Sequence, residues 1–264
     1  MKETLITALK TSGAELLNYF GEPVKTKQKE SQSSVVTAAD LRSDAMIVKL
    51  LTDKYPKHNI VSEEGGFIDR NSTYTWVIDP LDGTSNFASA IPWFGVLIAL
   101  FENSVPIMGG AYLPVTDDLY FAEREKGAVK NGIPFSIDKS LKLKDSLVAF
   151  AVDFTEDEAE LERSLLIYKN LVRSARNTRA TNCLIDFLNV SESKFGACIN
   201  LNTKIWDIAA LGLIITEAGG IMKETDGNNI IYNFNDNVTE KVFPVMVGTE
   251  SIIDEIEKKV LKIK

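Results

Sequence analysis

The chain has 264 residues, of which 45% are hydrophobic and 25% charged, a composition that suits a globular protein with a large buried core. Its 37 acidic residues outnumber its 29 basic ones, and the formal net charge at pH 7 is −8. Nucleic acids and anionic membranes are bound by basic surfaces, so we expect neither as a partner. The surplus of acidic side chains can instead hold cations.

The N-terminal twenty residues have polar and acidic side chains between their apolar positions, which excludes a signal peptide or a membrane span. Cys183 and Cys198 stand in apolar stretches, without the paired spacing of a zinc site or a disulfide framework, so we expect buried, reduced thiols. Both features predict a soluble, cytoplasmic protein.

Two amphipathic helices are predicted in the first part of the chain. Apolar positions from Leu5 to Phe20, including Leu17, recur at helical spacing, and Gly21 with Pro23 ends this helix. A polar stretch, KTKQKESQSS, then leads to a second helix that carries Met46, Ile47, Leu50 and Leu51.

From Trp76 onward, short apolar runs are separated by turn residues, a pattern typical of an antiparallel sheet: WVID, FGVLIALF, IMGGAYLP and DLYFAE. After Leu141 a strand, an acidic helix and further mixed elements lead to a charged C-terminal helix. No linker, repeat or low-complexity tract interrupts the chain. We therefore predict an α+β fold in one unit, residues 1–264, with closely packed halves at about 1–140 and 141–264.

Several catalytic motifs are missing. His58 is the one histidine, and no G-x-S-x-G elbow is present, so a catalytic triad is not expected. Nucleoside-triphosphate and dinucleotide fingerprints are missing too. His58, in the turn YPKHN, is predicted to lie on the surface.

The segment TWVIDPLDGTSNF is the most informative in the chain, because an apolar strand ends there in two aspartates. Pro80 restricts Asp79 to extended backbone and Gly83 permits a tight turn, so Asp79 and Asp82 can converge on one point. Converging carboxylates repel unless a cation lies between them, and hard dications such as Mg²⁺ take oxygen ligands. Thr84 begins a predicted helix whose N-terminus favours phosphate. An ordinary acidic turn is the alternative.

Two further acidic sites are candidates for the same cluster. Glu63 and Glu64 follow a short apolar strand, although adjacent glutamates also occur on solvated surfaces. Asp207 falls at the N-cap or in the first turn of an apolar helix, where capping is its alternative role.

Together these segments resemble the inositol monophosphatase family, whose signatures read approximately G-E-E, W-[IV]-[IV]-D-P-[IL]-D-G-T-x-N-F and W-D-x-A-A-x-x-x-x-x-E-A-G-G. The likeness extends to VVTAAD and REKGAVKNG, and it covers roughly the first 220 residues in matching order. The resemblance implies a layered αβαβα fold of the inositol monophosphatase/fructose-1,6-bisphosphatase type. It also implies a magnesium-dependent, lithium-sensitive phosphatase and, by analogy, a homodimer.

The resemblance also implies residue roles. Two or three Mg²⁺ ions would be bound by Glu63, Asp79, the carbonyl of Leu81, Asp82 and Asp207. Thr84 and Asp40 would orient or activate the attacking water. The substrate would be bound by Lys29, Asp82, Gly83, Thr84 and Asp207, with the Gly83 and Thr84 amides holding its phosphate.

The substrate is left open because the chain departs from the family where the leaving group binds. A predicted strand there carries Thr181, Asn182, Cys183 and Leu184 in place of a glycine, a small hydroxyl residue and alanines. Asn200 replaces the glutamate of inositol-selective relatives, so inositol specificity is in question.

We expect a Mg²⁺-dependent phosphomonoesterase that acts on a small phosphorylated metabolite, nearest to inositol monophosphate. Arg173, Arg176 and Arg179 could meet a second phosphate, so fructose 1,6-bisphosphate and 3'-phosphoadenosine 5'-phosphate are alternatives, as is histidinol phosphate. A non-catalytic Mg²⁺-binding regulatory protein is the alternative from another class.

Overall fold

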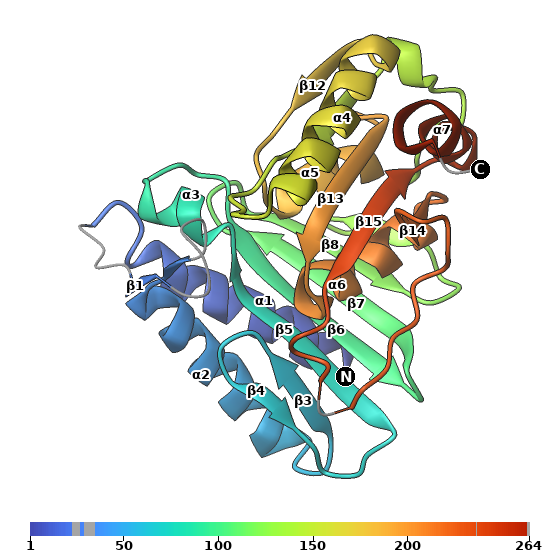
Figure 1. The fold of residues 1–264 in the computed structure, drawn as a ribbon. Coiled ribbons are helices and arrows are strands. Elements are labelled where there is room, and N and C mark those ends of the chain that lie inside the picture. The colour runs from blue at the N-terminus through green and yellow to red at the C-terminus, as the bar shows by residue number, and fades with distance from the viewer. Residues whose placement is uncertain (23–26, 29–34, 236, 263–264) are drawn as a thin grey trace.

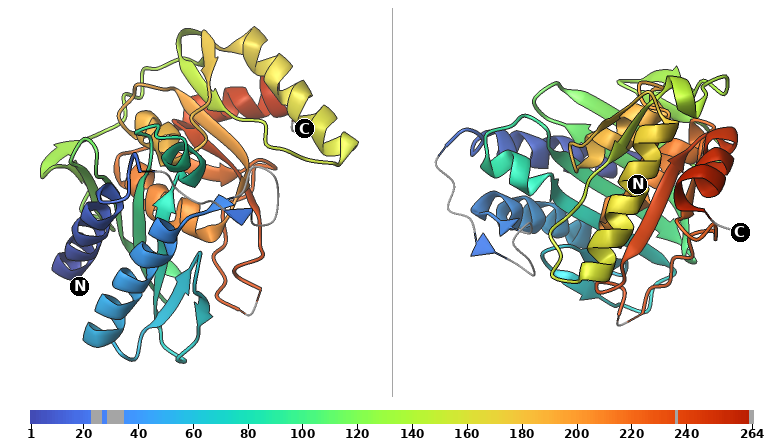
Figure 2. Two further views of the ribbon diagram at one scale, coloured as in Figure 1. Left: turned by 90° about the vertical axis from the view of Figure 1, so that its left-hand side faces the viewer. Right: turned by 45° about the horizontal axis from the view of Figure 1, so that its top comes forward.

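The computed structural model describes residues 1–22, 27–28, 35–235 and 237–262. Helices and sheets alternate in layers, as Figures 1 and 2 show. No helix in the described ranges is long and apolar enough to cross a lipid bilayer.

The larger sheet contains eight strands of the described chain, in the order β10-β9-β8-β7-β6-β5-β3-β4. All its neighbours are antiparallel except β3 and β5, which are parallel. The strands are β3 Asn59–Ser62, β4 Gly66–Ile68, β5 Tyr74–Asp82, β6 Gly95–Glu102, β7 Val105–Leu113, β8 Asp118–Glu123, β9 Ala128–Lys130 and β10 Ile133–Phe135.

The second sheet contains five strands of the described chain, in the order β12-β11-β13-β15-β14, with parallel and antiparallel pairs. Its strands are β11 Leu147–Phe150, β12 Asn177–Arg179, β13 Ala197–Thr203, β14 Ile221–Glu224 and β15 Phe243–Gly248. A separate antiparallel pair is formed by β1 Lys27–Gln28 and β2 Val35–Val36.

The α-helices are α1 Lys2–Leu17, α2 Ala38–Lys54, α3 Thr84–Ala88, α4 Glu158–Ser174, α5 Leu184–Ser191, α6 Ile205–Glu217 and α7 Glu250–Ile256. A 3₁₀ turn, η1 Leu143–Asp145, precedes β11, and a π-helical turn, η2 Glu257–Leu261, follows α7.

Side chains that alternate between the two faces of each strand form three apolar cores between the layers. In β6, Ile98 packs toward α1 and α2 whereas Ala99 packs toward α5 and α6. In β11, Ala149 joins that second core, and Val148 faces a third one under α4 and α7. Successive side chains of a strand point to opposite faces, so both sheets bury both faces. This order of layers confirms the predicted αβαβα arrangement.

Two adjacent glycines in β7 allow helices to approach the larger sheet from both sides. A Cβ at Gly109 would lie 2.8 Å from the carbonyl oxygen of Ala210 in α6. One at Gly110 would lie 2.6 Å from Leu9 Cδ1 in α1. Any side chain at either position would push a helix away from the sheet.

Some local predictions were wrong. Leu17, at the end of α1, is 42% exposed rather than buried. His58 is only partly exposed: its ring stacks with Tyr55 and Tyr74, and its Nδ1 accepts a 3.1 Å hydrogen bond from Trp76 Nε1. Both cysteines are free and buried, as predicted. The division into halves near residue 140 stays a prediction.

Candidate metal and active site

The end of β5 brings the first two aspartates of the site together. Asp79 pairs with Leu97 of β6, and the register then shifts before Asp82 pairs with Gly95, so the strand carries a bulge at Pro80 and Leu81. Gly83 follows with φ of +88°, and a Cβ there would lie 2.6 Å from the carbonyl oxygen of Trp93. Glycine is required at this turn because other residues neither favour that backbone angle nor fit the space.

A third aspartate comes from the first turn of α6. One carboxylate oxygen from each of Asp79, Asp82 and Asp207 lies within 4.8 Å of the others. We call these three residues the aspartate cluster. Three hard oxygen donors at this spacing fit a Mg²⁺ site.

Each member of the aspartate cluster accepts a hydrogen bond from a backbone N–H group. Leu81 N donates to Asp79 Oδ1 at 3.0 Å, and Leu184 N at the start of α5 donates to Asp82 Oδ1 at 2.7 Å. Lys204 N donates to Asp207 Oδ2 at 2.6 Å, so Asp207 also caps α6, as its alternative reading held. Capping occupies one oxygen and does not prevent the other from binding a cation.

The cluster is electrostatically costly without a cation. Burial raises the pKa of Asp79 well above its ordinary value, and the negative charges of Glu63, Asp82 and Asp207 raise it further. Burial likewise raises the pKa of Asp82 to about 7 and that of Asp207 well above its ordinary value. Each shift records that ionised carboxylates repel one another in a poorly solvated place. A bound dication would remove that repulsion.

Glu63 lies in the turn between β3 and β4, where its N–H group donates to the carbonyl of Ile78 at 3.2 Å. It lines the same cleft as the aspartates and raises the pKa of each of them, but it lies outside the 4.8 Å group. Glu64 lines the cleft too, and its charge raises the pKa values of Asp40 and Asp44.

Thr84 and Asp40 meet across 44 residues of sequence. Thr84 Oγ1 lies 2.9 Å from Asp40 Oδ1 and 3.0 Å from the carbonyl oxygen of Leu81. Asp40 is fully buried in the first turn of α2, and its Oδ2 accepts hydrogen bonds from the N–H and hydroxyl groups of Thr37. Burial raises the pKa of Asp40, and the bonds from Thr37 and Thr84 oppose that shift. Lys29 lies outside the described residues.

A cleft of about 1070 Å³ contains the aspartate cluster together with Glu63, Gly83 and Thr84. The sequence-predicted metal and phosphate residues in the described ranges are thus brought to one place. Asp40 stands behind Thr84 and is not part of the cleft surface.

The chain matches the inositol monophosphatase family over residues 1–259. The inositol monophosphatase of Dictyostelium discoideum is 29% identical, over 98% of this chain and 94% of its own length. A Neisseria meningitidis protein named putative Nus factor SuhB is 31% identical, over 86% of this chain and 87% of its own. The crystal structure of the extragenic suppressor protein suhB from Bartonella henselae superposes with a TM-score of 0.88 at 26% identity. The match covers 98% of this chain and 97% of that one.

The chain belongs to the inositol monophosphatase family. It is therefore a phosphoric monoester hydrolase, from a family that uses metal ions and acts on small phosphorylated substrates. The carboxylates needed to hold such ions are present in the aspartate cluster.

In this inositol monophosphatase relative, another part of the cleft surface carries amide groups beside a single aspartate. Asp153 Oδ1 accepts a 2.8 Å hydrogen bond from Asn182 Nδ2, and Asp153 Oδ2 a 3.4 Å bond from Asn202 Nδ2. Asn200 Nδ2 lies 3.5 Å from Asn182 Oδ1, and its own Oδ1 accepts from Asn202 N at 3.0 Å. We call Asp153, Asn182, Asn200 and Asn202 the amide wall.

The amide wall was only partly predicted. Asn182 and Asn200 were noticed through the likeness to the family, whereas Asp153 and Asn202 belong to no motif and carry no signal in the sequence. Residues 181–183 form a loop ahead of α5 rather than the predicted strand. Asp186, also missed, fixes this loop, because its Oδ2 accepts from Thr181 N and Asn182 N, both at 3.0 Å.

None of the three arginines proposed for a second phosphate lies on the cleft surface: Arg173, Arg176 and Arg179. Arg179 instead bonds the side chain of Asn177 and the carbonyl of Thr178. The three arginines are close in sequence to the leaving-group segment, but α4, β12 and the residues between them hold the arginines off the cleft surface.

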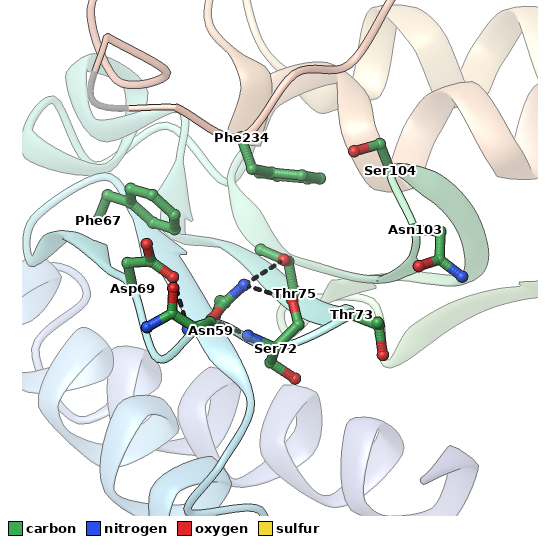
Figure 3. Close-up of a pocket in the computed structure, with 10 residues that line it drawn as sticks. Asn59, Phe67, Asp69, Ser72, Thr73, Thr75, Asn103, Ser104 and Phe234 are labelled. Atoms are coloured by element: carbon green, nitrogen blue, oxygen red, sulfur yellow. Dashed lines mark hydrogen bonds between the residues drawn. The ribbon is translucent and has the colours of Figure 1, made fainter.

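A second cavity of about 300 Å³ lies at the opposite end of β5, beside Thr75 (Figure 3). Its floor is made by Asn59, whose amide donates to Ser72 O and Thr75 Oγ1 and accepts from Arg70 N and Ser72 N. Because these bonds satisfy the buried amide, Asn59 holds the surrounding turn together and leaves no unused group for a ligand.

Proposed function

We propose that this protein is a Mg²⁺-dependent phosphomonoesterase that hydrolyses a small phosphorylated metabolite, nearest to inositol monophosphate, with metal-activated water. The observation that carries the proposal is the convergence of three backbone-anchored aspartates, none of them fully exposed, in the cleft that also contains Thr84. Such a site costs free energy when empty, and a cation removes the cost.

The proposed metal ligands are Glu63, Asp79, the Leu81 carbonyl, Asp82 and Asp207, for two or three Mg²⁺ ions. Bound Mg²⁺ would lower the pKa of a water molecule and neutralise charge on the phosphate and the leaving oxygen. The backbone holds each aspartate through one carboxylate oxygen, which fixes the orientation of the carboxylate toward the other two.

Thr84 and Asp40 are proposed to orient the attacking water and receive its proton. The water oxygen forms a bond to phosphorus while the bond from phosphorus to the leaving oxygen breaks, so no covalent enzyme intermediate is required. The Thr84 hydroxyl can accept a hydrogen bond from that water while it donates to Asp40 Oδ1. Thr37 holds Asp40 in place during this step.

The phosphate itself is proposed to lie against the amides of Gly83 and Thr84, where α3 begins, and near Asp82 and Asp207. The positive φ of Gly83 turns the chain sharply at this point. Lys29 is also proposed to bind the phosphate, because the family resemblance implies this role.

The substrate is proposed to be a monophosphate. A bisphosphate such as fructose 1,6-bisphosphate or 3'-phosphoadenosine 5'-phosphate would need a second cationic site, and none of the three candidate arginines lines the cleft. Histidinol phosphate stays an alternative. Asn200 lines the cleft. Its amide is proposed to face the leaving group, where inositol-selective relatives have a glutamate.

We further propose a cytoplasmic homodimer built from single inositol-monophosphatase-like units, with no nucleic-acid or membrane partner. The net charge of −8 supports the absence of polyanionic partners. Lithium is expected to compete with Mg²⁺.

A regulatory role is the second candidate, because the Neisseria meningitidis relative is named as a putative Nus factor. A protein acting only through partners would not need the hydrogen bond between Thr84 and Asp40. The complete site therefore favours catalysis as the primary role.

The deciding experiment measures phosphate release with Mg²⁺ and with EDTA, using inositol 1-phosphate, fructose 1,6-bisphosphate, 3'-phosphoadenosine 5'-phosphate and histidinol phosphate. We expect Mg²⁺-dependent release that is fastest with a monophosphate. Binding of Mg²⁺ without release from any ester would instead support the regulatory role.

A further inference from the structure

One side of α2 carries buried polar side chains at Asp40, Ser43 and Asp44. Residues three and four apart lie on the same side of a helix, so these side chains point together toward the larger sheet. Asp40 accepts a hydrogen bond from Thr84, and Ser43 Oγ donates to the carbonyl oxygen of Pro80, in the bulge of β5, at 2.6 Å. Two of the three side chains thus hold parts of the candidate site.

The third side chain, Asp44, is bonded to the last residue of β3. The hydroxyl of Ser62 donates to Asp44 Oδ1, and both side chains are buried. Ser62 Oγ also accepts from Gly65 N at 3.5 Å, so this hydroxyl links α2 to the turn between β3 and β4. Burial raises the pKa of Asp44, the hydrogen bond from Ser62 opposes that shift, and the negative charge of Glu64 adds to it.

This bond depends on a residue in which the chain departs from the family. The signature that reads approximately G-E-E has glycine at the position of Ser62. Glycine has no side chain to donate to Asp44. The link from α2 to the turn is therefore made by this chain's own residues.

Ser62 and Glu63 point to opposite faces of the larger sheet. Ile60 packs in the core beside α1 and α2, and Val61 packs in the core beside α5 and α6. Because successive side chains of a strand alternate between its faces, Ser62 follows Ile60 toward α2, and Glu63 follows Val61 toward α6, where it lines the cleft. An anchor on Ser62 at one face therefore holds the backbone that presents Glu63 at the other.

Glu63 stands next to Asp79 on the neighbouring strand. Ser62 pairs with Ile78 where β3 and β5 run parallel, and Glu63 N donates to the carbonyl oxygen of Ile78 at 3.2 Å, which continues the pairing by one residue. The turn is thus held to β5 by its backbone and to α2 by a side chain. Such support matters because a ligand must be kept within about 0.5 Å of its productive position.

We propose that Asp44 is a positioning residue for the metal site: through Ser62 it holds the turn that presents Glu63, and so sets how tightly Mg²⁺ is bound. The inference rests on the proposed function, in which Glu63 is a metal ligand. Asp44 itself does not line the cleft. Its effect reaches the ion through the turn.

The test measures binding of Mg²⁺ alone to the full-length, metal-free protein by isothermal titration calorimetry. We expect Asp44→Ala and Ser62→Ala each to weaken binding about tenfold or more, because partners behind metal ligands change affinity by about 10–100-fold. The double variant should bind about as weakly as either single one, since both remove the same bond. Asp44→Asn keeps an oxygen acceptor for the Ser62 hydroxyl and should stay within about threefold of the wild type.

A Glu63→Ala background tests the route of the effect. With no carboxylate left to position, adding Asp44→Ala should weaken Mg²⁺ binding by less than about twofold. Effects that multiply in full would show that Asp44 acts on the ion by another route, and would overturn the inference. Ser62→Ala loses only a hydroxyl, so it decides the question in the same background if Asp44→Ala does not fold.

Asn170→Ala is the control for a purely structural effect. It removes a buried hydrogen bond of 2.8 Å from α4 to the carbonyl of Val260, outside the cleft. It should lower Tm in EDTA and leave Mg²⁺ binding unchanged. The same result for Asp44→Ala and Ser62→Ala would make Asp44 a structural residue and overturn the inference, whereas phosphate release by the wild type with Mg²⁺ would still support the proposed function. A wild type that binds no Mg²⁺ would overturn both.

Discussion

The aspartate cluster is held by backbone N–H groups, whereas Asp153, which lines the same cleft, is held by the side-chain amides of Asn182 and Asn202. Backbone donors belong to the ends of β5, α5 and α6 and move only if those elements move. Side-chain donors can be replaced one at a time. In the proposed function the fold thus fixes the reaction, while substrate choice depends on exchangeable side chains.

The cluster and the surroundings of the amide wall also differ in the cause of their pKa shifts. Burial and mutual repulsion raise the pKa values of the cluster, whereas Asp186, next to the wall, has its pKa raised mainly by burial. Asp186 Oδ1 is buried and has no hydrogen-bond partner within the described chain. Repulsion within the aspartate cluster costs free energy that a bound cation would recover. Burial of the Asp186 carboxylate also costs free energy, and its hydrogen bonds to Thr181 and Asn182 hold the loop in place.

Removing one charge from the cluster should have the largest effect. Asp79→Asn is expected to lower kcat for phosphate release by at least about a thousandfold, because one of the proposed metal ligands loses its charge. Thermal unfolding in EDTA should show unchanged or higher stability, since the variant relieves repulsion. Asp53→Asn, on the exposed face of α2, is the control. Near-normal turnover by Asp79→Asn would show that the cluster is not the metal site.

The water-positioning pair should come next in size. Thr84→Ala is expected to lower kcat by about a hundredfold, with little change in Mg²⁺ affinity, because the hydroxyl between water and Asp40 is lost. Thr84→Ser keeps a hydroxyl and should retain most of the activity. Steady-state kinetics at several Mg²⁺ concentrations would measure both effects. Equal rates for the alanine and serine variants would remove Thr84 from the mechanism.

A change beside the amide wall, at Asp186, should alter substrate binding more than the rate of the chemical step. Asp186→Ala removes the acceptor for the N–H groups of Thr181 and Asn182, and Asn182 has a positive φ of 52° that this bond helps to hold. We expect KM to rise about tenfold for esters with large leaving groups and little for p-nitrophenyl phosphate.

Asp186→Asn is the matched control for that variant. It keeps an oxygen acceptor for both N–H groups, replaces the oxygen that has no partner and removes the charge that raises the pKa of Asp82, so the loop should be kept and KM should stay near the wild-type value. A uniform loss of kcat with every ester in Asp186→Ala would mean that the loop supports the cluster rather than the leaving group.

The smallest effect concerns pH in the absence of metal. The folded pKa of Asp82, about 7, lies above its ordinary value of 3.8, so between these values the folded state binds more protons than the unfolded one. Stability in EDTA should therefore fall as pH rises from about 4 to 7 and be lowest above that range. We expect Tm to fall by a few degrees, at about 2–4 °C per kcal/mol.

Saturating Mg²⁺ should flatten or reverse this trend, because bound cations favour the ionised carboxylates. Differential scanning calorimetry at pH 5 and pH 8, with and without Mg²⁺, would show it. A metal-free protein that becomes more stable over the same range would contradict the proposed repulsion.

Local patterns were sufficient for much of the fold. The apolar runs of β5 to β8 follow from a sheet that is covered on both faces, and the helical spacing of α1 and α2 follows from one buried helix face. The sequence could not indicate that β3 lies parallel to β5, because pairing between distant segments leaves no local pattern. The sequence also could not indicate the ring stacking of His58, because its aromatic neighbours Tyr74 and Trp76 come from β5.

The sequence by itself determined which aspartates form the proposed metal site. Asp79, Pro80, Asp82 and Gly83 are close in the chain, so the backbone preferences of proline and glycine make the aspartates converge. Asp207 was recognisable because it stands at the start of an apolar helix within a specific motif.

Only the tertiary structure decided what surrounds that centre. Asp153, Asn182 and Asn202 meet because β11, the loop before α5 and β13 lead to the same cleft, and the three arginines lie off its surface. Side chains from separate elements become neighbours through sheet order and helix packing, which no short stretch of sequence records.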